Sequence, residues 1–221
     1  MSRNVLRIKK IPHINFYSSS YKFKFCTKKG DYFSKNHLEN LRKFLNIDIK
    51  DCRFKLESLK EKYLLEAKRL LPDDNYIGFS LTQGNAYRKK SWAIQNFVDL
   101  AIKIKEKNKV PVFFIEKKDT KLFQEIKTAI PSALFPEQYS EFSCPALVTA
   151  LAARLNMAVS IDNGVMHMMG LANIPMIVLF GPTDSKKFAP EGNLIKILDS
   201  KMIYKSKDIN KITVYDVYRL V

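Results

Sequence analysis

The sequence predicts an α/β protein whose parallel sheet is covered by helices on both faces. Short, uninterrupted apolar runs recur from residue 76 onward, helical patterns separate them, and polar loops follow them. A chain of 221 residues that is 46% hydrophobic is also long enough to bury an ordinary core. We therefore expect a sheet domain over residues 73–221, preceded by a separate portion over residues 1–72.

The portion over residues 1–72 is expected to contain a strand and two helices. Basic and aromatic residues alternate over residues 21–25, as in a strand, and apolar residues recur at helical spacing from residue 36. The same helical spacing predicts a second helix over residues 56–71. Turn-forming residues beginning at Pro72 end this helix and mark the predicted domain boundary.

From residue 76 onward the predicted elements alternate regularly. Strands are predicted over residues 76–80, 110–115, 157–161 and 176–180, and helices over residues 91–108, 143–155 and 166–171. Ser143 is expected to cap the helix that carries Pro145 in its first turn. Thr213 and Asp216 form a capping-box pattern, which predicts a last helix.

The formal net charge of +16 is unevenly distributed along the chain. Residues 1–70 carry 18 Lys and Arg against 7 Asp and Glu, whereas the remaining residues carry 20 against 15. A Lys-rich surface attracts nucleic acid, an anionic membrane face and phosphorylated ligands through the same long-range field. Charge alone therefore does not distinguish among these three classes of partner.

Several classes of protein are disfavoured by the sequence. The chain has no run of 18 apolar residues, and its first ten residues lack the apolar segment of a secretory signal. We therefore expect a cytoplasmic protein that does not span a membrane. Cys26, Cys52 and Cys144 are odd in number and widely spaced, which argues against a disulfide framework and against a structural zinc site.

The loop formed by Asp162, Asn163 and Gly164 is the first candidate site. It follows a predicted strand and leads into a helix, whose first N–H groups and dipole can hold a diphosphate. Gly164 would let such a ligand approach the backbone closely. The alternative is a simple turn and helix cap, with His167 as a core histidine.

These residues occur in an order that resembles a known family. His167 stands three residues after Gly164, and a strand then leads into Phe, Gly, Pro and Thr at residues 180–183. This arrangement resembles the C-terminal domain of family 9 glycosyltransferases, the ADP-heptose:lipopolysaccharide heptosyltransferases, with their D-[ST]-G-x-x-H and F-G-P-T patterns. Asn163 stands where those enzymes usually have Ser or Thr.

The resemblance extends to the first loop of the sheet domain. The segment that contains Asn85 and Lys90 is similar to the family's glycine loop, and Lys90 takes the place of the donor-phosphate lysine. Trp92 is expected to anchor the following helix by packing. Enzymes of this type bind the ribose hydroxyls with an acidic residue after the second strand, and both Glu116 and Asp119 fit that description. A solvated mixed-charge loop is the alternative for these two residues.

The resemblance implies a Rossmann-like domain of GT-B type over residues 73–221, with residues 1–72 as a basic, incomplete remnant of the N-terminal acceptor domain. It covers residues 76–221 and, weakly, residues 36–71. The implied donor-binding residues are Lys90, Asp162, Asn163, Gly164, His167, Asn85, Glu116, Asp119 and Thr183. No organic cofactor is implied and no metal, because the sequence contains no DxD motif of the metal-dependent kind.

The implied activity is transfer of a sugar from an ADP-heptose-like nucleotide diphosphate donor to a lipopolysaccharide core or a related glycan. The catalytic base is expected in an N-terminal region that is missing from this chain, so we expect impaired turnover. Peripheral contact between the basic portion and the anionic inner face of the membrane is a further expectation. Two alternatives remain: a basic nucleic-acid-binding protein that stacks bases on residues 21–25, and a noncatalytic donor-binding partner subunit.

Overall fold

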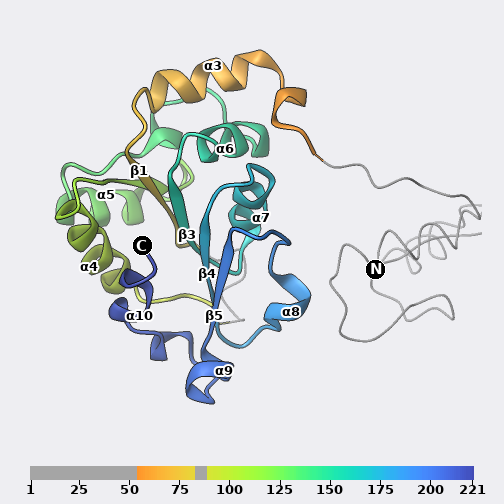
Figure 1. The fold of residues 1–221 in the computed structure, drawn as a ribbon. Helices are drawn as coiled ribbons and strands as arrows, with labels where there is room; N and C mark the ends of the chain where they lie inside the picture. The colour runs from red at the N-terminus through yellow and green to blue at the C-terminus, as the bar shows by residue number, and fades with distance from the viewer. Residues whose placement is uncertain (1–53, 83–88) are drawn as a thin grey trace, which may run out of the picture. The chain divides into compact units, whose positions relative to one another are not determined.

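The computed structural model describes residues 54–82 and 89–221 of the chain (Figure 1). The strand expected over residues 21–25 and the helix expected from residue 36 lie outside these residues. The sheet belongs to one compact unit, Phe54–Ser185 with Ala189–Val221.

Five parallel strands form a single sheet in the order β2-β1-β3-β4-β5. They are β1 Tyr76–Ser80, β2 Val110–Phe114, β3 Met157–Ile161, β4 Met176–Phe180 and β5 Ile195–Asp199. The four predicted strands are confirmed. The strand β5 was not predicted, because it lies at the sheet edge and its first three residues are exposed or half-buried, so that it has no continuous apolar run. The strand order reverses direction between β1 and β3, which makes their carboxyl ends the topological switch point.

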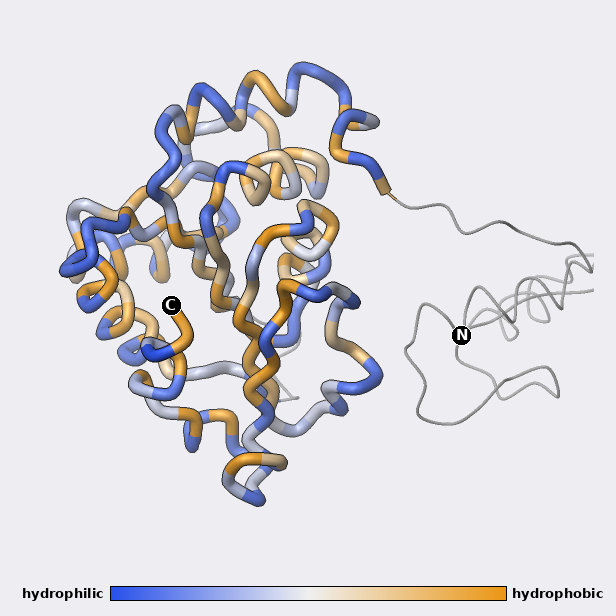
Figure 2. Tube along the Cα trace, viewed as in Figure 1, coloured by the Kyte–Doolittle hydropathy of each residue, from blue (hydrophilic) through white to orange (hydrophobic). Residues whose placement is uncertain are grey.

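Helices cover both faces of the sheet, as the sequence predicted. They are α3 Glu61–Leu70, α4 Ile94–Lys105, α5 Thr120–Ala129, α6 Pro145–Ala152, α7 Gly164–Leu171, α8 Ser185–Phe188, α9 Ser200–Tyr204 and α10 Val214–Tyr218. Short 3-10 turns occur at Leu56–Ser58, Pro136–Gln138 and Ile209–Lys211. One apolar cluster joins α4, α5 and α10 to a face of the sheet, whereas α6 and α7 pack side by side, with α3 outside α6 (Figure 1). In Figure 2 the strands are mostly apolar, while α3 alternates between hydrophilic and hydrophobic residues.

Several predicted helices begin or run differently in the structure, among them α6 and the helix predicted over residues 56–71. Ser143 does not cap α6; Cys144 is the N-cap, with an extended backbone. The following proline accounts for this, because a residue before proline is disfavoured in the helical region. The helix predicted over residues 56–71 is interrupted by two extended residues, Leu59 and Lys60, so α3 begins only at Glu61.

Two other predictions about local structure are confirmed. Thr213 and Asp216 form the expected capping box at the start of α10. Trp92 is 1% exposed, and its indole N–H donates to the Ile212 carbonyl at 2.8 Å, while its ring packs edge-on against Phe97. This anchoring holds the segment before α4 extended, so the helix begins at Ile94 rather than at Ser91.

The helix α3 is tied to the sheet domain by polar contacts as well as by packing against α6. The guanidinium of Arg154 donates to the carbonyls of Leu71, Pro72 and Asp73 at 2.9–3.0 Å, which satisfies groups at the end of α3. The domain boundary expected near Pro72 stays a prediction. In residues 54–82 and 89–221, every helix is too short or too polar to span a lipid bilayer.

Candidate functional site

Asn163 joins the ends of β1 and β3 at the switch point of the sheet. Its side-chain oxygen accepts from the Met166 N–H at 2.8 Å, which makes it the N-cap of α7. Its amide nitrogen donates to the Ser80 hydroxyl at 2.8 Å and to the Thr82 carbonyl at 2.9 Å. One side chain therefore fixes both the start of the helix and the spacing of the two strand ends.

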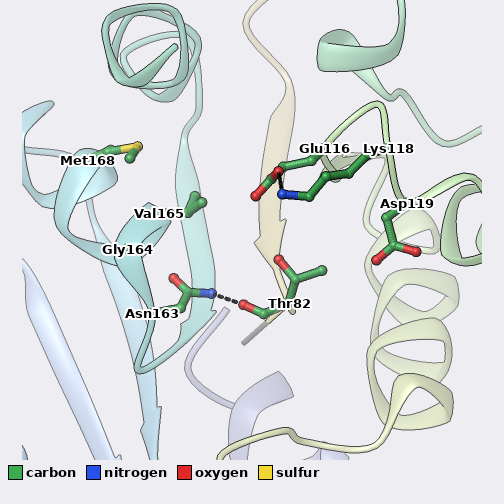
Figure 3. Close-up of a pocket in the computed structure, with 8 residues that line it drawn as sticks. All are labelled: Thr82, Glu116, Lys118, Asp119, Asn163, Gly164, Val165 and Met168. Carbon is green, nitrogen blue, oxygen red and sulfur yellow. Dashed lines mark hydrogen bonds and ion pairs between the residues drawn. The ribbon is translucent and has the colours of Figure 1, made fainter. Parts of the chain in front are cut away.

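A cavity of about 430 Å³ lies beside this junction (Figure 3). It is lined by Thr82, Glu116, Lys118, Asp119, Asn163, Gly164, Val165 and Met168. These residues come from the ends of β1 and β2 and from the beginning of α7. The lining thus combines carboxylates and a helix N-terminus with apolar side chains, which is the mixture typical of small-molecule sites.

Gly164 is the first residue of α7, and the space beside it is open. A Cβ atom built on Gly164 would meet no atom within 4 Å. The first N–H groups of a helix have no partners within the helix and carry the positive end of its dipole. The cavity therefore reaches backbone donors suited to an anion, and a side chain at position 164 would extend into open space beside those donors.

Lys90 forms a half-buried ion pair with Asp162, the residue that precedes Asn163. The Lys90 ammonium lies 2.8 Å from the Asp162 carboxylate and 2.8 Å from the Asp162 backbone carbonyl. The two side chains are 12% and 9% exposed, so water screens their attraction only in part. The pair connects the segment before α4 to the end of β3 across 72 residues of sequence.

His167 lies on α7 and is exposed, so the alternative of a core histidine is wrong. Loss of hydration around its ring lowers the pKa of His167 below 6.5. The Asp162 carboxylate opposes this shift and the Lys90 ammonium adds to it. The imidazole therefore senses both members of the ion pair.

Glu116 and Asp119, the two carboxylates after β2, both line the cavity, but they have different partners. Asp119 is the N-cap of α5, where it accepts from the Leu122 N–H at 3.4 Å. Glu116 lies 2.5 Å from the ammonium of Lys118, and both of these side chains are largely exposed. Such an exposed ion pair contributes little to stability, so Glu116 is available for other contacts.

A third carboxyl group near this loop was not predicted from the sequence. Glu137 is 9% exposed, and burial, followed by the charge of Glu116, raises its pKa to about 7. The neighbouring Gln138 donates its amide to the Ile115 carbonyl at 2.7 Å, one residue before Glu116. No sequence signal marked these residues, because they lie in a short 3-10 turn that has no periodic pattern.

Thr183 is not among the residues that line the cavity. Its carbonyl accepts a hydrogen bond from the Lys201 ammonium, and its hydroxyl oxygen is buried without a hydrogen-bond partner. Asp199, 5% exposed at the end of β5, accepts from the Ser185 hydroxyl at 2.7 Å and from the Lys201 N–H at 2.9 Å. These contacts fix the loop after β4, and the sequence did not point to Asp199 because β5 was not predicted.

The structure thus brings Asn163, Gly164, Glu116 and Asp119 together at one cavity. Asp162, which pairs with Lys90, directly precedes the lining residue Asn163 in the sequence. Asn85 lies outside the described residues. Thr82, Lys118, Val165 and Met168 were missed as lining residues. In the part of the chain that the structure describes, no group of three or more His, Cys, Asp or Glu residues is arranged to hold a metal ion.

A model of glycosyltransferase family 9 (heptosyltransferase) matches residues 33–219 of the chain. A search of curated proteins found no match. Three of the solved structures that match the chain share its fold at low sequence identity. A family 9 glycosyl transferase from Veillonella parvula is 17% identical, with a TM-score of 0.72, over 88% of this chain and 60% of that one.

The other two structures come from E. coli. The heptosyltransferase WaaC with ADP is 14% identical, with a TM-score of 0.65, over 87% of this chain and 57% of that one. ADP-heptose lps heptosyltransferase II is 18% identical, with a TM-score of 0.59, over 73% of this chain and 50% of that one. This chain therefore spans 60% or less of the length of these three solved structures. At these identities the likeness establishes the fold, and it confirms the expected Rossmann-like sheet of GT-B type.

Proposed function

Because the chain belongs to glycosyltransferase family 9, we propose that its cavity binds the diphosphate and nucleoside of a nucleotide-sugar donor. The sugar is then transferred to a lipopolysaccharide core or a related glycan. The observation that carries the proposal is the meeting of an open helix N-terminus, a lysine and two carboxylates at the switch point of a parallel sheet. ADP-heptose is the donor that we favour, since similar solved structures are described as heptosyltransferases and as bound to ADP.

The diphosphate binds at the start of α7 in this proposal. Gly164 leaves room for phosphate oxygens beside the first N–H groups of the helix, and Lys90 supplies a positive charge from the loop before α4. As the bond from the sugar to the diphosphate breaks, negative charge grows on the departing phosphate. Fixed donors and an ammonium at that place lower the energy of the transition state. No metal ion is part of this proposal.

We propose Glu116 rather than Asp119 as the residue that accepts the ribose hydroxyls. Asp119 already accepts a hydrogen bond as the N-cap of α5, whereas Glu116 has only its exposed partner Lys118. A carboxylate without other fixed partners can accept two neighbouring hydroxyl donors. Asp119 then contributes through the shape of the loop and through its charge.

Asp162, His167 and Thr183 are proposed to act on the sugar side of the donor. Asp162 adjoins the diphosphate position and His167 follows on the exposed side of α7. Thr183 is proposed from the F-G-P-T pattern of the family, and its hydroxyl is buried without a hydrogen-bond partner in the structure. The base that takes the proton of the acceptor hydroxyl is not assigned to any of these residues.

The basic residues 1–70 are proposed to meet an anionic surface, either the inner face of the membrane or a phosphorylated acceptor glycan. The charge of these residues is what supports the contact with an anionic surface, and a cytoplasmic location is proposed together with it. Association with vesicles that contain anionic lipid should weaken as salt is added. Equal association with neutral and anionic vesicles would contradict the membrane version.

Calorimetric titration of the full chain with ADP and ADP-heptose tests the proposed donor site. Lys90→Ala should lower the affinity for both ligands by about 10-fold to 100-fold, because the proposed charged hydrogen bond to phosphate is lost. Lys68→Ala, which removes an exposed lysine from α3, is the matched control and should leave both affinities unchanged. Failure of the unmodified chain to bind either ligand at millimolar concentration would refute the proposal.

A further inference from the structure

Asp162 lies beside the proposed diphosphate site, although its carboxylate carries the same sign of charge as the ligand. Its carboxylate lies 2.8 Å from the Lys90 ammonium, and its own backbone carbonyl accepts from the same ammonium at 2.8 Å. Two of the three donors of Lys90 are therefore directed at Asp162. The carboxylate is 9% exposed and the lysine side chain 12% exposed, so bulk water replaces neither contact easily.

A phosphate that approaches Lys90 meets the Asp162 carboxylate at the same ammonium. Two anions that share one cation repel each other, and the repulsion is strong where water is partly excluded. The carboxylate can relieve this repulsion by turning away from Lys90. It then loses a charge-assisted hydrogen bond, and the cost is small only if another donor replaces the ammonium.

We infer that Asp162 is a specificity-determining residue that favours a sugar-bearing nucleotide diphosphate over the free nucleotide diphosphate. The inference rests on the proposed function of the cavity. The carboxylate competes with the diphosphate for Lys90, and a sugar on the diphosphate offers hydroxyl donors in exchange. Free ADP has no hydroxyl at that position, so nothing replaces the hydrogen bond that Asp162 loses when the diphosphate contacts Lys90. Asp162 therefore lowers the affinity for the nucleotide diphosphate once the sugar has left.

The effect of the charge can be separated from the effect of the shape by the substitution Asp162→Asn. Asparagine keeps the size of the side chain and the backbone carbonyl, but it removes the negative charge that competes for Lys90. The matched control is Asp74→Asn, which removes one exposed carboxylate from the turn before β1, at the opposite end of the strand. Both variants change the net charge of the chain by the same amount.

Calorimetry with ADP, AMP and ADP-heptose on the three proteins gives the test. Asp162→Asn should raise the affinity for ADP by about tenfold and lower the affinity for ADP-heptose. The affinity for AMP, which lacks the second phosphate, should change by less than about twofold. Asp74→Asn should leave all three affinities within about twofold of the unmodified chain. Weaker binding of ADP by Asp162→Asn would overturn the inference while leaving the donor site intact.

A crystal structure of the unmodified chain with ADP tests the same exchange without any variant. The Lys90 ammonium should lie within hydrogen-bond distance of a phosphate oxygen, and the Asp162 carboxylate should have moved away from it. A complex in which both anions remain hydrogen-bonded to Lys90 would overturn the inference. Failure of the unmodified chain to bind ADP and ADP-heptose would instead refute the proposed function, and the inference with it.

Discussion

Glu137 is the residue whose titration has the clearest consequence for stability. Burial, followed by the charge of Glu116, raises its pKa from 4.5 to about 7. The folded chain therefore binds a proton more tightly than the unfolded chain, and stability falls as the pH rises from about 4.5 through 7. Glu137→Gln should remove this loss and raise the unfolding free energy at pH 8 by roughly 2 to 3 kcal/mol. Denaturant unfolding at pH 5 and pH 8 measures it, and equal gains at both values would contradict this assignment.

Gly164 and Gly78 are predicted to respond in opposite ways to the same added methyl group. A Cβ at Gly164 meets nothing within 4 Å, whereas a Cβ at Gly78 would lie 2.4 Å from a methyl carbon of Leu155. Gly164→Ala should therefore leave the free energy of unfolding unchanged or raise it slightly. It should lower the affinity for ADP at least about tenfold, because the methyl group enters the proposed phosphate position. Gly78→Ala should cost about 1 to 3 kcal/mol of stability.

Thermal unfolding and calorimetry on both glycine variants separate the two effects. The unfolding temperature of Gly164→Ala and its ADP affinity should change independently. Unchanged ADP affinity in a folded Gly164→Ala protein would contradict the placement of the phosphate beside α7, whereas loss of stability would contradict the open space beside Gly164.

Among the elements, α3 depends on a single side chain for the groups at its end. Arg154 donates three hydrogen bonds to the carbonyls of Leu71, Pro72 and Asp73. Arg154→Met keeps much of the aliphatic stem but leaves those carbonyls without this donor, so it should cost about 1.5 to 3 kcal/mol. Faster proteolytic cleavage near residues 71–74 should accompany the loss, and Arg154→Lys should restore part of the stability. Unchanged stability in Arg154→Met would show that the packing of α3 on α6 alone suffices.

The strands β1 to β4 and the helix α7 were predictable because their signals are local, whereas α5, which begins at the site, was not predicted. Apolar runs identified β1 to β4, and the loop of Asp162, Asn163 and Gly164 pointed to the start of α7. The sheet edge was not predictable in the same way, because β5 is half-exposed and Lys196 interrupts its apolar pattern. The start of α6 was misplaced by one residue, although Pro145 carried the information that fixes it.

The candidate site was predictable only as a set of residues that lie far apart in the sequence. Motif spacing indicated Lys90, Asn163 and Gly164, but it could not show that Lys90 contacts Asp162 or that Asn163 donates to Ser80. These contacts depend on the order of the strands, which brings the ends of β1 and β3 together. Glu137 and Asp199 were missed because burial of a polar group has no signature in a single sequence.

At the scale of the whole molecule, the net charge of +16 makes weak binding to any polyanion unavoidable at low salt. A specific ligand is distinguished by its resistance to salt and by a saturable rise in the unfolding temperature. ADP at about 100 times its dissociation constant should stabilise the folded chain by about 2.7 kcal/mol. Single-stranded RNA should raise the unfolding temperature only at low ionic strength. Salt-resistant stabilisation by RNA without an effect of ADP would favour a nucleic-acid-binding protein instead.

In the proposed function, a nucleotide diphosphate binds where α7 begins, at the switch point between β1 and β3. Two-dimensional NMR of the backbone amides during titration of the uniformly labelled chain with ADP tests whether the ligand binds at this place. We predict that the largest shifts occur at the amides of Gly164 and Val165, with further shifts at Thr82 and at Glu116. Shifts confined to the exposed lysines, or absent from the first turn of α7 when ADP is saturating, would contradict it.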